Sequence, residues 1–191
     1  QNDLMAFDIG SDMLRPLSSP VFSQGDSRWW LVASDPTGPR VVLSHEDGIV
    51  IWNYAESKLE HLLQPQGWIK SMTPIFAIYS RDGRTLFVAA DAYWDGECEL
   101  TAWDSMTGMQ LSRKRVKGAP GARLAVSPAD RLVGLACGKS LYLWDSNLTD
   151  PPIETAEASG ASPFREIAFS PNSKNLAVRL DDALIVYSIA H

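Results

Sequence analysis

Aromatic residues recur along this chain at nearly constant spacing, each at the end of a short apolar run. Four of the runs are GIVIWN, ECELTAWDS, GKSLYLWDS and DDALIVYS, which carry Trp52, Trp103, Trp144 and Tyr187. A fifth, DLMAFDIGS, carries Phe7 near the N-terminal end. Successive aromatics are 45, 51, 41 and 43 residues apart. A repeat of this length predicts a series of similar supersecondary units that stack on one another.

A serine supplies a second landmark in the same register. The runs WWLVAS, IFAIYS, RLAVS and EIAFS end 18, 23, 17 and 17 residues before the aromatic of their repeat. Each serine is followed by turn residues, including Pro128 and Pro171, and then by another apolar run. Short runs rich in Val, Ile, Leu and aromatics between turns are typical of β-strands. Each repeat therefore predicts three buried strands and a more polar fourth strand.

The pattern resembles the WD40 family over essentially the whole chain. The resemblance is carried by Trp103-Asp104, Trp144-Asp145, the SPxxxxL hairpins at Ser127 and Ser170, and the SRDG hairpin at Ser80. It implies an all-β fold: a single-domain β-propeller with four-stranded antiparallel blades, of which about four to five are present. Within residues 1–191 we expect blades at about 3–17 (partial), 28–65, 74–117, 121–158 and 164–190 (partial). Trp52, Trp103, Trp144 and Tyr187 are then expected in the core between blades.

Part of the family's polar network is missing. A WD40 repeat usually places a Gly-His pair before its first strand and links it to a Ser or Thr, an Asp and the Trp. No His of this chain follows a Gly, and only Ser44, Asp47 and Trp52 keep part of the set. Ala89 and Ala136 occupy the Ser position elsewhere. We therefore expect a divergent propeller that is held together mainly by packing.

The sequence begins within a blade. WD40 propellers commonly close with more blades than are found here, and the chain starts with Gln1. Two interpretations remain open. The remaining blades lie upstream in the same chain, which makes this the C-terminal part of a longer propeller, or a second copy closes the ring.

Charge and apolar patterning exclude several classes of partner. The net charge is −6, which disfavours binding to nucleic acid or to an anionic membrane. Arg113, Lys114, Arg115 and Lys117 lie together on a predicted outer strand, where basic side chains also prevent unwanted strand pairing. No apolar run is long enough to span a membrane.

The two cysteines lie in or beside strands of adjacent predicted blades. We interpret Cys98 and Cys137 as buried free thiols rather than as a disulfide. Free thiols are typical of a reducing compartment, so the expected location is cytoplasmic.

No residue pattern in the sequence indicates catalysis or metal binding. No arrangement of Ser, Cys or paired carboxylates stands out as catalytic, and no residues have the spacing of zinc ligands. We therefore expect no catalytic residue, no bound metal and no cofactor. The acidic stretch from Asp91 to Glu99 is predicted to be a solvated loop, with a Ca²⁺ site as the alternative.

Large aromatics in two predicted loops are candidates for partner binding. One loop holds Trp68 and Lys70, and the other holds Tyr93 and Trp94. Trp and Tyr dominate interface hot spots; the alternative is that Trp68 and Trp94 pack over blade edges or against each other. The predicted function is a non-enzymatic scaffold that binds a protein or peptide on one propeller face. The alternatives are an enzyme or ligand-binding propeller of another family, and an extracellular propeller that binds Ca²⁺.

Overall fold

The computed structural model describes residues 5–8, 13–16, 30–45, 48–64, 75–92, 96–129, 131–158 and 162–189. These ranges contain seventeen strands. None of the described residues belongs to a helix with the length and apolar character needed to cross a membrane.

The strands form five separate antiparallel sheets, which we call blades 1 to 5 in chain order. Blade 1 is the pair β1 (Met5–Asp8) and β2 (Met13–Pro16), and blade 2 contains β3 (Trp30–Ser34), β4 (Arg40–His45), β5 (Gly48–Asn53) and β6 (Lys58–Leu63). Blade 3 contains β7 (Ile75–Tyr79), β8 (Thr85–Ala92), β9 (Glu97–Asp104) and β10 (Gln110–Lys117). Blade 4 contains β11 (Arg123–Val126), β12 (Leu132–Cys137), β13 (Ser140–Asp145) and β14 (Glu154–Glu157), and blade 5 contains β15 (Glu166–Phe169), β16 (Asn175–Arg179) and β17 (Leu184–Ser188).

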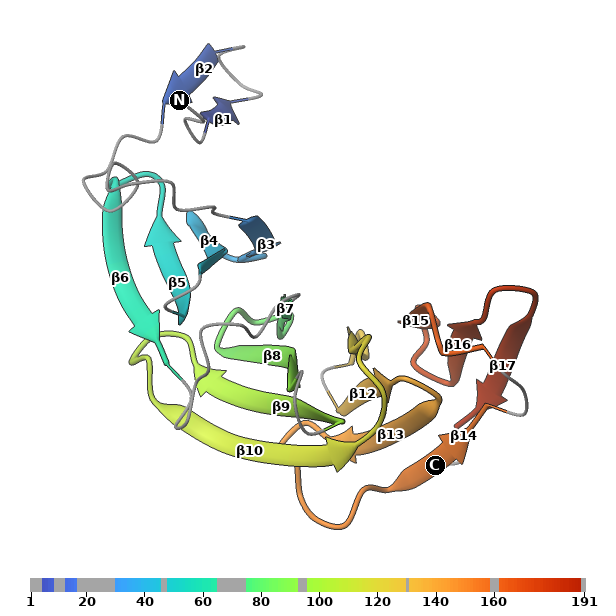
Figure 1. The fold of residues 1–191 in the computed structure, drawn as a ribbon. Helices are drawn as coiled ribbons and strands as arrows, with labels where there is room; N and C mark the ends of the chain where they lie inside the picture. Colours follow the sequence, from blue (N-terminus) through green and yellow to red (C-terminus); the bar gives the residue numbers. More distant parts are fainter. Residues whose placement is uncertain are drawn as a thin grey trace.

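The blades are arranged as an arc around a common centre (Figure 1). Within each blade, consecutive strands pair with one another. The first strand, such as β3, β7 or β15, lies nearest the centre, and the last, such as β6 or β10, lies on the outside. The prediction of an all-β propeller with four-stranded antiparallel blades is confirmed.

Blades 3 and 4 bury both of their faces against neighbouring blades, as β8 of blade 3 demonstrates. Leu86, Val88 and Ala90 pack into the cluster shared with blade 2. Phe87 and Ala89, which alternate with them, pack into the cluster shared with blade 4. Because side chains of a strand point alternately to opposite faces, one apolar run supplies two interfaces at once.

Three of the repeating aromatics, Trp103, Trp144 and Tyr187, lie in interfaces between blades, whereas Trp52 lies in a cluster formed by blade 2 residues alone. Trp103 belongs to the cluster between blades 2 and 3, and Trp144 to the cluster between blades 3 and 4. Tyr187 is half-buried against the cluster between blades 4 and 5. Trp52 is buried with Leu43 on the opposite face of blade 2.

The repeating serine closes the turn between the first two strands of a blade. The Ser80 hydroxyl accepts a 2.9 Å hydrogen bond from the Thr85 amide and donates to the Asp82 carboxylate at 2.7 Å. The Ser127 hydroxyl accepts from the amides of Arg131 and Leu132 at 3.1 and 3.0 Å. Ser170 repeats the arrangement of Ser80 with Asn172 and Asn175. The serine recurs in the sequence because its hydroxyl holds this turn in blades 3 to 5.

A threonine takes over part of the missing polar network in blade 3. The Trp103 indole N–H donates to the Thr101 hydroxyl at 2.8 Å, and that hydroxyl donates to the carbonyl of Val88 at 3.4 Å. Thr101 is two residues from Trp103 on the same strand, so both side chains point to the same face. All three groups are buried in an apolar surrounding, where an unpaired donor is costly.

Replacing Thr101 with Val should therefore destabilise blade 3. The substitution keeps the shape but leaves the Trp103 N–H without an acceptor, which lowers the free energy of unfolding by about 1–3 kcal/mol. Urea denaturation measures the change. Thr101→Ser keeps the hydroxyl and should retain more of the stability than Thr101→Val; the reverse order would contradict the role of this hydrogen bond.

The structure corrects the prediction for the cysteines. Cys98 at the start of β9 and Cys137 at the end of β12 form a disulfide between blades 3 and 4, with Cα atoms 5.9 Å apart. The prediction of free thiols was wrong because spacing along the chain does not reveal which positions of adjacent blades face each other. The argument from thiols for a reducing compartment is thereby removed, and the cytoplasmic location stays a prediction that nothing in the structure tests.

Loss of this cross-link should be measurable. The two cysteines are 39 residues apart, and closing a loop of that length in the unfolded chain corresponds to about 4 kcal/mol of stability in the chain-entropy model. The double variant Cys98→Ser/Cys137→Ser should therefore melt at a lower temperature than the oxidised protein. A reducing agent should lower the melting temperature of the unsubstituted protein only. Two titratable thiols in the denatured, unreduced protein would contradict the disulfide.

Candidate functional site

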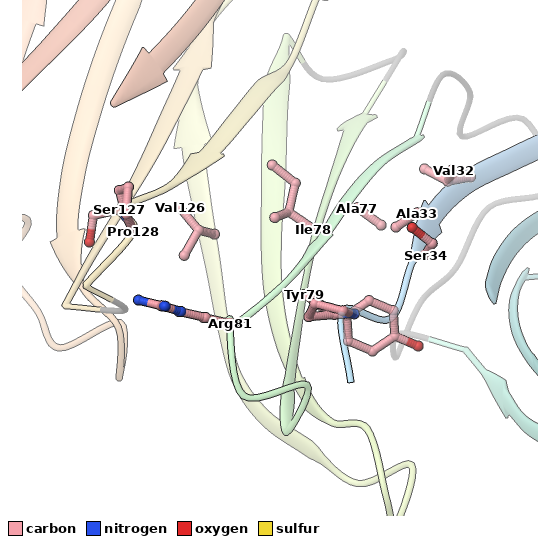
Figure 2. Close-up of a pocket in the computed structure, with 11 residues that line it drawn as sticks. Val32, Ala33, Ser34, Ala77, Ile78, Tyr79, Arg81, Val126, Ser127 and Pro128 are labelled. Atoms are coloured by element: carbon pink, nitrogen blue, oxygen red, sulfur yellow. The ribbon is translucent and has the colours of Figure 1, made fainter. Parts of the chain in front are cut away.

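A groove of about 460 Å³ opens where the innermost strands of blades 2, 3 and 4 end (Figure 2). It is bounded by the last residues of β3, β7 and β11 and by the turns that follow them. The lining consists of Val32, Ala33, Ser34, Pro36, Ala77, Ile78, Tyr79, Arg81, Val126, Ser127 and Pro128. The groove therefore spans three consecutive blades.

The floor of the groove is apolar and continuous with the inter-blade core. Ala77 and Tyr79 belong to the cluster between blades 2 and 3, with Val32 and Ala33 packed against it. Ile78 and Val126 pack against the next cluster, on the side of blade 4. Ala33 and Ala77 are small, so the backbones of β3 and β7 leave room above them. A rigid, apolar concave surface of this size is typical of ligand and peptide sites.

Arg81 supplies the charge on the groove wall. Its side chain reaches from the end of β7 toward Ser127 and Pro128 (Figure 2). The residue follows Ser80 directly, and in blades 4 and 5 the corresponding residue is Pro128 or Pro171. Proline suits this turn position because its φ is preset. The turn itself therefore does not require an arginine. Arg81 differs from the prolines of the other two repeats in bringing a positive charge to the groove wall.

Tyr79 contributes an aromatic wall and a neutral hydroxyl. Burial raises the pKa of Tyr79 well above its ordinary value, and the nearby positive charge of Arg40 offsets this only in part. The guanidinium of Arg40 lies 5.9 Å from the centre of the Tyr79 ring. The phenol consequently stays protonated and does not act as a base at neutral pH.

A buried ion pair fixes the blade 2 side of the groove. The Arg40 Nε donates to the Asp35 carboxylate at 2.6 Å, and the Asp35 side chain has no exposed surface. Arg40 also donates to the carbonyls of Ser105 and Gly83 at 3.1 and 3.2 Å. One side chain of blade 2 thereby satisfies two carbonyls in turns of blade 3.

Replacing the buried Arg40 should lower the free energy of unfolding far more than replacing an exposed arginine. Arg40→Met leaves the Asp35 carboxylate buried without its cation, and we expect the free energy of unfolding to fall by about 3–5 kcal/mol. The double variant Asp35→Ala/Arg40→Met should lose less than Arg40→Met alone. Arg84→Met, at a side chain that is 82% exposed, is the matched control and should change stability by less than about 0.5 kcal/mol. Equal losses in Arg40→Met and Arg84→Met would contradict the bridging role.

Among the described residues that line the groove, none is a His, a Cys or a carboxylate. The hydroxyl of Ser127 is occupied by two backbone amides, as described above, so no general base activates it. In the described part of the chain, no group of three or more His, Cys, Asp or Glu residues is placed to hold a metal ion.

The acidic stretch from Asp91 to Glu99 was predicted to be a solvated loop, but in the structure the residues at both of its ends are buried. Asp91 is buried, and its carboxylate accepts hydrogen bonds from the amides of Gly121 and Ala122 at 2.9 and 2.7 Å. Glu99 is buried and pairs with Arg113 at 2.6 Å and Arg115 at 3.0 Å. These partners lie on another strand or in the next connection, which local sequence does not reveal. Because both carboxylates are already bound internally, they favour a structural role over Ca²⁺ binding.

The basic cluster lies on the outer strand β10, where it was expected. Besides the two arginines that bind Glu99, Lys114 pairs with Asp150 of blade 4. These side chains therefore hold blade 3 together and tie it to blade 4.

The aromatic candidates for partner binding cannot be placed. Trp68, Lys70, Tyr93 and Trp94 lie outside the described residues. The groove was not predicted from the sequence. The signal that would have pointed to it is Arg81 in a turn position that holds proline in two other repeats.

Comparisons with known proteins define the class of fold. Among solved structures, 868 chains are similar to this one. One is the β-propeller domain of Myceliophteria thermophila Cps50 (Swd1), a WD40-type propeller, with a TM-score of 0.71 and 15% sequence identity over 99% of this chain. No family model matches the sequence, and no curated protein matches it.

The chain thus has the fold of a WD40-type β-propeller. It spans 63% of the matched domain, so its described blades correspond to part of a ring. At this level of identity the likeness concerns the fold alone.

Proposed function

We propose that this chain is a non-enzymatic scaffold that binds a protein or peptide partner. The observation that carries the proposal is the groove between blades 2, 3 and 4, which combines an apolar floor with a charged wall and whose described lining residues include no His, Cys or carboxylate. Function in folds of this kind lies in sites built on the scaffold rather than in the fold itself.

Rigidity makes the groove suitable for recognition. Its floor belongs to the inter-blade core, and its blade 2 side is held by the buried pair Arg40–Asp35. A site that is already formed loses little conformational entropy on binding, so that more of the contact energy appears as affinity. Shape and a few polar contacts then supply recognition without any bond being made or broken.

The two predicted loops that hold large aromatic residues are a second candidate surface for binding the partner. The proposal that Trp68, Lys70, Tyr93 and Trp94 form a partner-binding patch rests on residue type alone. The contact chemistry of that patch would be aromatic, whereas the groove offers small apolar side chains and an arginine. The two surfaces are therefore distinguishable by substitution.

Selection from a random dodecapeptide display library tests the groove without knowledge of the partner. Ser34 is exposed and lines the groove, so Ser34→Trp fills the groove without replacing a buried residue. We expect the selected peptides to bind this variant at least about tenfold more weakly than the unsubstituted protein, a loss of about 1.4 kcal/mol. Fluorescence anisotropy with labelled peptides gives the dissociation constants.

Two further variants serve as controls. Ser188→Trp adds the same side chain at an exposed serine of blade 5, outside the groove, and should leave binding unchanged. Trp94→Ala reports on the aromatic loops. If the selected peptides bind Ser34→Trp as tightly as the unsubstituted protein, the groove is not the site, and loss on Trp94→Ala would assign binding to the loops instead.

A further inference from the structure

The turn between β13 and β14 contains an acceptor sequence for N-linked glycosylation. Asn147, Leu148 and Thr149 form the pattern Asn-X-Thr, in which X is not proline. None of the other four asparagines of the chain is followed two positions later by Ser or Thr. Because the pattern is short, its meaning depends on where the fold places it.

The fold exposes the two residues that define the pattern and buries the residue between them. Asn147 and Thr149 are exposed, whereas Leu148 is 1% exposed and packs in the cluster between blades 3 and 4. The Asp145 carboxylate accepts hydrogen bonds from the backbone amides of Asn147 and Thr149, each at 3.0 Å. The turn is therefore anchored from within and leaves both side chains of the pattern accessible to an enzyme.

The side chain of Asn147 can be extended without loss of a contact. In the part of the chain that the structure describes, its backbone amide forms a hydrogen bond and its carboxamide forms none. The connection between β13 and β14 lies on the outside of the arc (Figure 1). An oligosaccharide on this nitrogen would thus project into solvent. No residue from 146 to 153 lines the groove, so the groove lining would stay free.

The disulfide is an independent observation that points to the same modification. Cys98 and Cys137 are both buried and joined to each other. Disulfides form and persist in oxidising compartments such as the lumen of the endoplasmic reticulum and the bacterial periplasm. An Asn-X-Thr sequence acts as a glycosylation acceptor in proteins that are exported from the cytoplasm. A chain that acquires this disulfide has therefore taken the route on which its acceptor sequence is used.

We infer that Asn147 carries an N-linked oligosaccharide, added while the chain passes through an oxidising compartment. The donor is an oligosaccharide linked to a polyprenyl pyrophosphate. C1 of its first sugar forms a bond to Asn147 Nδ2, the bond from C1 to the pyrophosphate oxygen breaks, the pyrophosphate leaves with the bonding electrons, and the amide nitrogen loses one proton. This route replaces the cytoplasmic location expected from free thiols, and the inference does not rest on the proposed function.

Mass spectrometry of the protein isolated from its source organism tests whether the site is occupied. Trypsin releases residues 140–165 as one peptide, which is bounded by Lys139 and Arg165. We expect the mass of this peptide to exceed that of its sequence by an oligosaccharide, and its fragment masses to place the sugar on Asn147. The peptide recovered entirely without sugar would overturn the inference.

Variants of the exported chain test which residues form the acceptor. The 191-residue chain is expressed behind a cleavable signal peptide in a eukaryotic host and recovered from whole cells, so that the glycan is counted even where a variant is not secreted. The unsubstituted chain and Thr149→Ser should each gain one glycan, because serine keeps the hydroxyl of the pattern. Asn147→Gln and Thr149→Ala should gain none.

An asparagine outside the pattern provides the matched control. Asn172 is exposed in a turn of blade 5, and Asn172→Gln should keep the single glycan of the unsubstituted chain. A glycan that persists in Asn147→Gln would overturn the assignment to this residue. An exported unsubstituted chain without any glycan would overturn the acceptor itself.

Discussion

Contact between the faces of adjacent sheets is the interaction on which the whole molecule depends. A four-stranded antiparallel sheet in isolation leaves two apolar surfaces in water. Here the side chains of β8 alternate between the cluster toward blade 2 and the cluster toward blade 4. Burial of apolar area is worth about 25 cal/mol per Å², so blades 3 and 4 draw stability from a neighbour on each face. Such a chain is stabilised mainly by nearest-neighbour interfaces.

The groove follows from the same packing. The innermost strands converge on the centre of the arc, and small residues such as Ala33 and Ala77 let them approach. Where β3, β7 and β11 end, the turns diverge and leave a concave surface whose floor is the edge of the core. Polar groups near this surface either bind within the scaffold, as Asp35 and Arg40 do, or project from the turns, as Arg81 does.

Local features of the sequence predicted the repeating part of the structure. The repeat period, the serine before each turn and the aromatic at the end of the third strand recur at fixed places within each repeat, so that spacing along the chain was enough to find them. Contacts between blades were harder to foresee. The partners of Asp91 and the disulfide of Cys98 depend on the register of one blade against the next, which no pattern within a repeat encodes. The four aromatic-loop residues stay predictions.

The disulfide between Cys98 and Cys137 affects the order in which the blades unfold. In a row of stacked units, opening normally begins at whichever junction is weakest and spreads from there. Blades 3 and 4 are joined covalently across their shared face, whereas blade 5 meets blade 4 without such a link in the described residues. The oxidised protein should therefore open first at the junctions on either side of blades 3 and 4 and retain this pair, which unfolds as one cooperative block. Since the groove lies across blades 2, 3 and 4, two of its three walls belong to that block and outlast the rest of the arc.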